Sequence, residues 1–404
     1  MDSDMQVSEP SAKYMVKAEE YQQPEAGIIP HEWTVKRLGE IVTFQRGFDL
    51  PHRNRKSGDY PIVTSSGFEE FHNEYRAKAP GVVTGRYGTI GQVFLVATDY
   101  WPLNTTLYVR DFHGNDPNFI SHLLRTVDFH SHSGKSGVPG VNRNDLHEIK
   151  TAYPADIAEQ QAIATALSDT DALIDALEQL LAKKRQVKQG AMRELLTGEK
   201  RLAGFHGEWA IKILGDCLSN PPEYGINAPA VDFSDQLPTY IRITDITDDG
   251  EFRPNPKVSV KTHNLEQYTL KQGDILFTRT GASVGKSYLY TKKDGPLIFA
   301  GFLIRVRAKQ EELLPEFLFA LTKTENYWKW VTVMSMRSGQ PGINGNEYKQ
   351  LPIPVPSIEE QAAIAAILSD MDTDITELET RLGKVRQVKQ GMMRELLTGR
   401  TRLA

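Results

Sequence analysis

The sequence contains a single cysteine, Cys217, among 404 residues. One cysteine can form neither an internal disulfide nor a cysteine-based zinc site, so we predict that Cys217 is a small buried apolar residue. No stretch approaches the roughly 18 to 20 apolar residues that a membrane span needs, and the acidic start has no basic region followed by an apolar one. The sequence therefore predicts a cytoplasmic protein without a membrane segment.

The chain also has little net charge, with 47 basic against 52 acidic side chains. This average hides the local distribution, because residues 1–30 carry about −4, residues 31–155 about +1 and residues 204–357 about zero. Two balanced blocks can each present a basic face to a nucleic acid. The first 26 residues match no other part of the chain, and we expect a disordered tail there.

Motifs for catalysis and for metal binding are missing too. The histidines have no metal-ligand spacing. Residues 281–287 resemble a phosphate-binding loop, but Thr280 stands where that loop needs a glycine. Residues 220–223 resemble the Asn-Pro-Pro-aromatic motif of amino-methyltransferases, but Glu223 replaces the aromatic residue that stacks on a flipped base. With no catalytic triad or paired-carboxylate cluster either, the sequence indicates a chain without enzymatic activity, metal or cofactor of its own.

What the sequence does contain is a long internal repeat. Residues 159–203 match residues 360–404 without a gap at about 30 of 45 positions. Apolar residues recur in both copies at alternating spacings of four and three, which is typical of a coiled-coil helix. Capping boxes, Asp156 with Glu159 and Ser357 with Glu360, are expected at the helix starts, and Gly198 and Gly399 are expected to end the helices. Ser168-Asp169 and Ser369-Asp370 look like second caps that could divide each helix.

Charge is segregated along each repeat, with acidic residues in the first half and basic residues in the second. Antiparallel pairing places opposite charges together, so we predict that the two helices form an antiparallel coiled coil with each other. The residues expected to pair the helices are Ile163, Leu167, Ile174, Leu177, Leu181, Ile364, Leu368, Ile375, Leu378 and Leu382.

The blocks before the two helices are weakly related. Both begin with Trp-x4-Leu-Gly-acidic, at Trp33 and Trp209, and both close on Ser-Gly-x-Pro-Gly-Val/Ile-Asn-x-Asn. Each alternates β-prone runs with turns and has one helical run, at residues 117–126 and 315–330, whose aromatic residues we expect in the core. The sequence predicts an α+β fold with two similar domains and two long helices, in a nearly circular, pseudo-twofold arrangement.

The candidate binding residues are polar and basic side chains in loops. Residues 52–58 are rich in donors suited to phosphate and to guanine edges, although such a loop can equally be a solvated surface. Other basic residues lie in glycine-bounded loops at matching places of the two blocks. The predicted DNA-binding residues are Arg53, Asn54, Arg55, Lys56, Arg86, Tyr87, Lys135, Arg143, Arg279, Lys286, Arg337 and Gln340.

The paired repeats, each following a block that closes on Ser-Gly-x-Pro-Gly-Val/Ile-Asn-x-Asn, resemble the specificity subunit of type I restriction–modification systems. The resemblance covers about residues 27–404. It implies target recognition domains at 27–155 and 204–357, which read the two halves of a split, asymmetric sequence in double-stranded DNA. It also implies conserved spacer helices at 156–203 and 358–404. A rigid spacer suits two dissimilar half-sites, since their separation must be fixed geometrically.

The resemblance further implies docking to two methyltransferase subunits and to restriction subunits. S-adenosylmethionine, ATP and Mg²⁺ would then be bound by those partners, which modify adenine and cut DNA. Two other classes stay open. A self-contained DNA-modifying enzyme would show methyl transfer by the isolated chain, and a coiled-coil adaptor that binds protein would lack salt-dependent DNA binding.

Overall fold

The computed structural model describes residues 21–22, 29–133, 140–262 and 265–403. It divides into two compact units, one of residues 1–178 and 380–404 and the other of residues 179–379. The division falls inside the two long helices, α4 (Ile157–Thr197) and α9 (Ile358–Leu396). Each unit therefore holds one globular domain and one half of each helix. Within the described ranges no helix is long and apolar enough to cross a membrane.

The first unit is built on an antiparallel four-stranded sheet in the order β4-β10-β7-β8. A smaller sheet follows in the order β6-β5-β9, in which β5 pairs antiparallel with β6 and parallel with β9. The strands are β4 (Thr43–Arg46), β5 (Tyr60–Thr64), β6 (Gly67–His72), β7 (Gly81–Gly85), β8 (Val93–Val96), β9 (Trp101–Pro102) and β10 (Thr106–Asp111).

The second unit repeats this topology. Its antiparallel sheet has the order β13-β20-β17-β18, and in its other sheet, β14-β16-β15-β19, β15 again pairs antiparallel with one neighbour and parallel with the other. The strands are β13 (Glu223–Tyr224), β14 (Ala230–Asp232), β15 (Thr239–Ile241), β16 (Val258–Val260), β17 (Ile275–Thr278), β18 (Ser287–Leu289), β19 (Leu297–Phe299) and β20 (Leu303–Val306). The prediction of two domains with one fold is confirmed.

A two-stranded antiparallel sheet joins the start of each domain to its end. In the first unit β3 (Trp33–Arg37) pairs with β11 (Lys150–Pro154), and in the second β12 (Ala210–Ile213) pairs with β21 (Pro352–Val355). A further two-stranded antiparallel sheet consists of β1 (Tyr21–Gln22) and β2 (Ile29–Pro30), which are neighbours in the chain. The short helices are α1 (Leu38–Ile41), η2 (His52–Asn54), α2 (Pro117–Leu124), α3 (Arg143–His147), η3 (Leu214–Cys217), η4 (Ile243–Asp245), α5 (Leu265–Tyr268), η5 (Gly281–Ser283), η6 (Lys292–Asp294), α6 (Pro315–Leu321), α7 (Glu325–Ser335) and α8 (Gly345–Tyr348).

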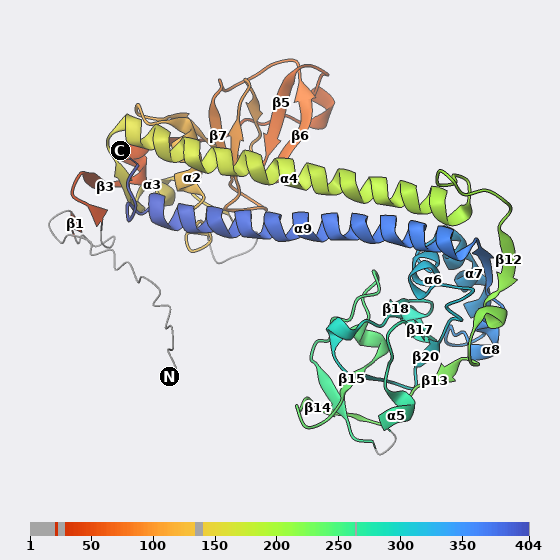
Figure 1. Cartoon of the computed structure of the whole chain (residues 1–404). Coiled ribbons are helices and arrows are strands. Elements are labelled where there is room, and N and C mark those ends of the chain that lie inside the picture. The colour runs from red at the N-terminus through yellow and green to blue at the C-terminus, as the bar shows by residue number, and fades with distance from the viewer. Residues whose placement is uncertain (1–20, 23–28, 134–139, 263–264, 404) are drawn as a thin grey trace, which may run out of the picture. The chain divides into compact units, whose positions relative to one another are not determined.

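The helices α4 and α9 are antiparallel, as their charge pattern predicts (Figure 1). In the first unit, acidic residues of α4 bind basic residues of α9, through Asp171–Lys389 and Glu178–Arg386. In the second unit the signs are exchanged, and Lys184 of α4 lies 2.7 Å from Asp374 of α9. The expected breaks at Ser168 and Ser369 are wrong, because the helices run through both positions and the seam continues on either side.

The end of each helix packs into a domain core. Leu396 of α9 and Leu397, directly after it, are buried with Trp33 of the first domain. Leu195 and Leu196 of α4 are buried in the core of the second domain. Both ends are closed by a glycine in the left-handed region, with φ of +74° at Gly198 and +72° at Gly399. The C-terminal segment thus completes the N-terminal domain, which confirms the circular arrangement.

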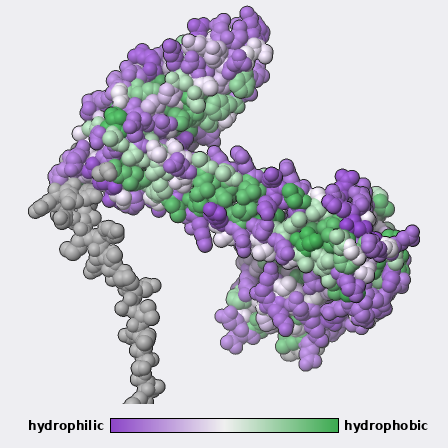
Figure 2. Space-filling view, turned by 45° about the horizontal axis from the view of Figure 1, so that its top comes forward, coloured by the Kyte–Doolittle hydropathy of each residue, from purple (hydrophilic) through white to green (hydrophobic). Residues whose placement is uncertain are grey.

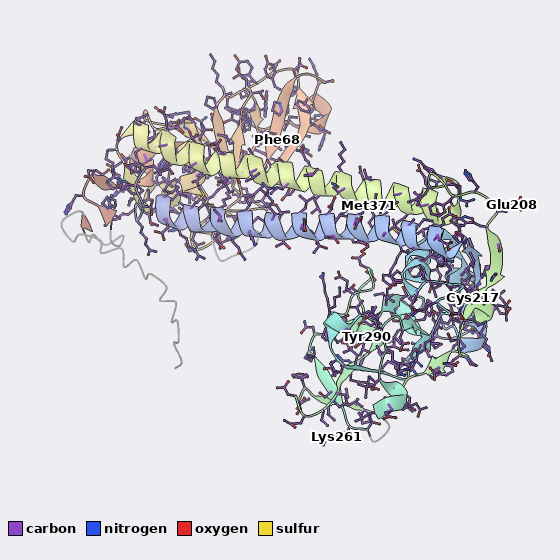
Figure 3. All side chains as sticks on the ribbon, viewed as in Figure 1. Phe68, Glu208, Cys217, Lys261, Tyr290 and Met371 are labelled. Atoms are coloured by element: carbon purple, nitrogen blue, oxygen red, sulfur yellow. The ribbon has the colours of Figure 1, made fainter. Side chains whose placement is uncertain are left out.

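Two local expectations need correction. The helical run at residues 315–330 is two helices, α6 and α7, because Thr324 caps a new helix by accepting a hydrogen bond from the Tyr327 amide. Trp328 on α7 is 37% exposed rather than buried in the core, whereas Phe317 is fully buried. Cys217, labelled in Figure 3, is buried as predicted.

The expected capping boxes do not form either. The Ser357 hydroxyl caps α9 by accepting from the Glu360 amide, but the Glu360 side chain turns instead to Arg201 and Trp209. At the start of α4 the Glu159 carboxylate likewise accepts hydrogen bonds from Arg402 and Trp33. Burial explains both cases, because these carboxylates are 1% and 4% exposed and a charged partner stabilises them more than a backbone amide does.

Candidate functional site

One loop directly follows β7 in the first unit, and an equivalent loop follows β17 in the second. The two loops have the same backbone contacts. In the first unit the Arg86 amide donates to the Thr105 carbonyl (2.8 Å), and the Arg86 carbonyl accepts from the Val141 amide (2.9 Å). Tyr87 forms a bridge with Gly140. These bonds join the loop to the Gly-Val-Asn segment that ends the domain.

The second unit repeats these contacts at Arg279. Its amide donates to the Phe302 carbonyl (3.1 Å), and its carbonyl accepts from the Ile343 amide (2.9 Å). Thr280 forms the bridge with Gly342. Arg86 and Arg279 therefore occupy one backbone position in two copies of the fold, and the recurrence seen in the sequence is a structural equivalence.

Both arginines lie against an aromatic ring. The Arg86 Cζ atom is 4.6 Å from the centre of the Tyr87 ring, and the Arg279 Cζ atom is 4.9 Å from the centre of the Tyr224 ring. The Tyr224 hydroxyl accepts a hydrogen bond of 2.9 Å from the Gly345 amide, which fixes the ring. Tyr87 and Tyr224 are 41% and 43% exposed, so these contacts are on the surface.

The basic loop at residues 52–58 is divided between exposed and supporting side chains. Arg53, Asn54 and Lys56 are exposed. The Arg55 side chain is only 9% exposed, pairs with Glu69 and Glu70 at 3.4 and 2.9 Å, and donates to the Leu50 carbonyl. The hydrogen bond from Arg55 lowers the pKa of Glu70. Arg55 thus holds the loop to β6, and the exposed residues beside it remain available to a ligand.

The other candidate residues differ in how far they are already bound. Arg143 and Gln340 are exposed. Lys286 lies 2.6 Å from Asp248 and its hydrogen bond lowers the pKa of that carboxyl, while Arg337 pairs with Glu347. Lys135 lies outside the described residues. Gln340 lies beside the Arg279 loop, with its amide nitrogen 3.1 Å from where a Cβ on Gly281 would be.

The residues expected to pair the helices lie along the facing sides of α4 and α9. Ile163, Leu167, Leu177 and Leu181 of α4 are buried, as are Ile364, Leu368 and Leu382 of α9. Ile174, Ile375 and Leu378 are half-buried. Ile163 and Leu167 also belong to the core of the first domain, and Ile364 and Leu368 to that of the second, so each helix start serves its domain as well as the pair.

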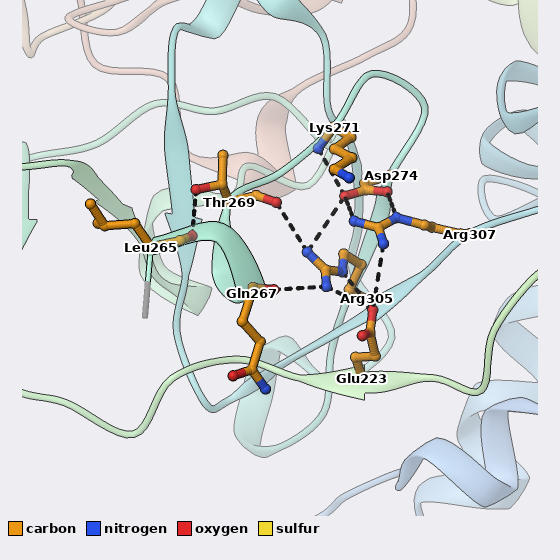
Figure 4. Close-up of polar contacts among 8 residues, drawn as sticks. All are labelled: Glu223, Leu265, Gln267, Thr269, Lys271, Asp274, Arg305 and Arg307. Carbon is orange, nitrogen blue, oxygen red and sulfur yellow. Dashed lines mark hydrogen bonds and ion pairs between the residues drawn. The ribbon is translucent and has the colours of Figure 1, made fainter. Parts of the chain in front are cut away.

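The two enzyme-like motifs have structural explanations. Residues 281–287 begin with the short helix η5 (Gly281–Ser283) and reach the first residue of strand β18, whereas a phosphate-binding loop leads into a helix. Glu223 belongs to β13 and binds Arg305, which is 2% exposed, at 2.7 Å. Arg305 also faces Asp274 and donates to the carbonyls of Gln267 and Thr269 (Figure 4). Glu223 therefore compensates a buried charge.

The described residues hold no candidate metal cluster, and one cavity of the second unit is separate from the Arg279 loop. Among the described residues no group of three His, Cys, Asp or Glu side chains could hold a metal ion. A cavity of about 270 Å³ in the second unit lies between the end of α4, the β12–β21 pair and α6–α7, and its lining is largely apolar, with Leu196, Ile211 and Trp330. Neither Arg279 nor Gln340 lines this cavity, so it is separate from the loop cluster.

Sequence reasoning missed several residues of the loop clusters. Tyr224 and Phe302 are distant in sequence from Arg279, and only the sheet pairing brings them to it. Phe302 is 57% exposed. An aromatic residue after a glycine, as in Gly301-Phe302, is the weak sequence signal that was available.

Comparisons with known proteins agree with this architecture. A family model described as the type I restriction modification DNA specificity domain matches residues 30–189 and 235–387. The specificity subunit of the type I restriction enzyme MjaVIII from Methanocaldococcus jannaschii is 22% identical over 428 residues, which cover 96% of this chain and 97% of the relative.

Two solved structures share the fold. The S subunit of a type I restriction-modification system from M. genitalium matches with a TM-score of 0.65 at 15% identity, over 90% of this chain and 96% of its own. A chain from a structure concerned with complex assembly and conformational transition of the type I R-M system matches with a TM-score of 0.51 at 16% identity, over 92% and 99%. From the family match, which covers more than half of its length, this chain belongs to the type I restriction–modification DNA specificity family.

Proposed function

We propose that this chain is the DNA-recognition subunit of a type I restriction–modification complex. The observation that carries the proposal is one fold present twice with different loops on it. The main sheets have the same strand order and direction, and Arg86 and Arg279 occupy one position, yet Tyr87 and Thr105 in the first unit correspond to Thr280 and Phe302 in the second. Such a pair of domains suits two dissimilar half-sites in one asymmetric DNA sequence.

In this proposal the two helices set the length of the unspecified spacer between the half-sites. α4 has 41 residues and α9 has 39. At about 1.5 Å per residue each helix is about 60 Å long. Ion pairs in both units and a seam of buried Leu and Ile side chains support a stiff pair.

The helices are also the proposed docking site for two methyltransferase subunits. In the first unit they expose Leu173 (41%) and Val388 (58%), and in the second Leu180 (42%) and Val187 (51%). Figure 2 shows hydrophobic residues gathered on the visible face of the helices. Apolar side chains that gather into one exposed patch mark a surface that a partner covers.

The proposal gives this chain no chemistry of its own. The methyltransferase subunits would bind S-adenosylmethionine and modify adenine, and restriction subunits would use ATP and Mg²⁺ to cut DNA. The role of this chain is to hold the complex on one bipartite sequence in the cytoplasm.

Methylation mapping of a host that carries the partner genes tests the proposal. With this gene present, methylated adenines should appear in one bipartite sequence, and with a frameshifted copy they should be absent. Identical methylation in both strains would contradict the proposal. Salt-dependent binding of the purified complex to duplex DNA separates a DNA reader from a protein-binding adaptor, which would show none.

A further inference from the structure

Arg86 and Arg279 are matched in their stacking as well as in their backbone position. Each guanidinium lies over a tyrosine ring at 4.6 to 4.9 Å, although Tyr87 follows Arg86 directly and Tyr224 comes from another strand. The same arrangement is thus built from different residues in the two units. A stacked guanidinium keeps its plane and its N–H edge in one orientation, so less entropy is lost when that edge binds a ligand.

Among the described residues, Arg86 and Arg279 differ from the arginines that are bound to a carboxylate. Arg55, Arg305 and Arg337 each bind a carboxylate. In the described part of the chain no carboxylate forms an ion pair with Arg86 or Arg279. Their stacking tyrosines offer a ring face and leave the forked donors unused. An arginine that is oriented but not neutralised is arranged for an external acceptor.

The surroundings allow a ligand to approach. Gly88 follows Tyr87 with φ of +77°, and Gly281 follows Thr280 with φ of +76°, so both loops turn sharply beside the arginine. A Cβ on Gly140 would lie 2.3 Å from the Tyr87 ring, so the loop needs glycine there. Polar side chains border both turns, Ser65 in the first unit and Gln340 in the second. Arg86 and Arg279 are themselves half-buried, so each keeps part of its side chain at the surface beside these turns.

We propose that Arg86 and Arg279 each read a guanine, one in each half of the bipartite sequence. This inference rests on the proposed function. The fork of an arginine matches the O6 and N7 acceptors that guanine presents in the major groove. The neighbours explain how one arginine position serves two different half-sites: Tyr87 and Thr105 border it in the first unit, whereas Thr280 and an exposed Phe302 border it in the second.

Mapping the sequences methylated by variant complexes is the first test. Arg86→Ala should relax one guanine in one half of the sequence and leave the other half intact, and Arg279→Ala should do the reverse. Arg37→Ala and Arg253→Ala are matched controls, because both side chains are exposed and already paired with a glutamate. The controls should leave the sequence unchanged. A half-site without a specified G·C pair would overturn the inference for that unit.

The second test measures the contact itself on duplexes that carry the mapped sequence, with the purified complex of this chain and its methyltransferase subunits. Replacing the read guanine by 7-deazaguanine removes the N7 acceptor and should weaken binding by the wild-type complex about 5- to 150-fold. It should change binding by the Arg279→Met complex much less, because methionine keeps an unbranched stem but has no donor for N7. Equal losses in wild type and variant would show that Arg279 contacts only phosphate and would overturn the inference.

The outcomes separate this inference from the proposed function. No bipartite methylation by the wild-type complex would reject the proposed function, whereas bipartite methylation with unchanged guanine preference in both variants rejects only the role of the arginines. Where Arg86→Ala or Arg279→Ala abolishes methylation, Arg86→Met and Arg279→Met decide, because methionine has no donor for O6 or N7. A methionine variant that methylates with guanine still fully specified contradicts the inference, and one with that position relaxed supports it.

Discussion

Arg402 donates two hydrogen bonds to the buried carboxylate of Glu159, from Nε and Nη2, and so binds the end of the chain to the start of α4. The Trp33 indole donates to the same carboxylate at 3.3 Å. In the second unit Arg201, Trp209 and Glu360 form the equivalent cluster. Arg402, which follows α9, thus neutralises Glu159 in the first turn of α4. Arg201, which follows α4, neutralises Glu360 in the first turn of α9.

Removing Arg402 should destabilise the first unit strongly. Arg402→Ala leaves Glu159, which is 4% exposed, without its cation, and we expect a loss of about 3 to 5 kcal/mol in the free energy of unfolding. Arg37→Ala is the control, because that side chain is 58% exposed and its pair with Glu148 is on the surface, so it should cost under about 1 kcal/mol. Denaturant unfolding monitored by amide exchange in α2 measures both, and equal effects would show that the cluster is unimportant.

The basic loop should separate into a binding residue and a supporting residue. Arg53 is exposed, so Arg53→Ala should leave stability unchanged and weaken specific DNA binding by about 1 to 3 kcal/mol if it contacts a base, and by less if it contacts phosphate. Arg55→Ala should loosen the loop, because Arg55 binds Glu69, Glu70 and the Leu50 carbonyl. Binding titrations and amide exchange of β6 measure these two effects. Unchanged DNA binding by Arg53→Ala would remove this residue from the interface.

His122 should make the first unit sensitive to acid. Burial lowers its pKa to about 4, and its ring contacts Ser168 and Arg125. The unfolded chain titrates near the usual histidine pKa of about 6.5, so between about pH 6.5 and 4 the unfolded state binds more protons. The free energy of unfolding should therefore fall as the pH decreases through this range, by up to about 3 kcal/mol.

Two variants test this pH dependence. His122→Gln should flatten the profile between about pH 6.5 and 4, whereas His132→Gln, at an exposed position, should not. Amide exchange in α2 reports the first unit at each pH. A His122→Gln profile as steep as that of the wild type would assign the acid sensitivity to other groups.

The helices should act as a ruler. Inserting four residues near Ala176 adds about 6 Å of rise and about 400° of rotation, a net turn of about 40°. One DNA base pair advances about 3.4 Å and turns about 34 to 36°. Because a misrotated loop turns away from its groove, we expect the unspecified spacer to lengthen by one base pair with both half-sites unchanged. Selection of methylated sites from a library with spacers of every length measures this, and an unchanged preferred spacer would show that the helices do not set the distance.

The sequence predicts most of the architecture because its periodic and repeated features are local. The seam and the charge segregation of the repeats specify two antiparallel helices, and the paired Trp-x4-Leu-Gly starts specify two related domains. Sequence reasoning failed where a residue distant in the sequence determines the local structure. Glu159 has the spacing of a capping box, but Arg402 lies 243 residues away and provides a stronger partner. Trp328 has the helical spacing expected of a core residue. Thr324 instead caps a new helix, α7, and Trp328 lies on the side of α7 that faces solvent.

The candidate site was predicted only in part for the same reason. Arg86 and Arg279 stand out by their glycine-bounded loops, whereas Tyr224 and Phe302 become their neighbours only through the register of β13, β17 and β20. Arg55 looks like its neighbours in sequence, and only the pairing of β5 with β6 brings Glu69 and Glu70 to it. Long-range pairing of this kind leaves no periodic pattern.

The most direct test of the account is to exchange one reading domain and map the sequence that the complex methylates. Replacing residues 27–155 by the corresponding domain of a relative should change one half of the recognised sequence and keep the other half and the spacer. The exchanged segment ends before α4, so both long helices stay those of this chain and the contact between Arg402 and Glu159 is retained. If the exchange altered both halves, or left both unchanged, the two domains would not read separate half-sites.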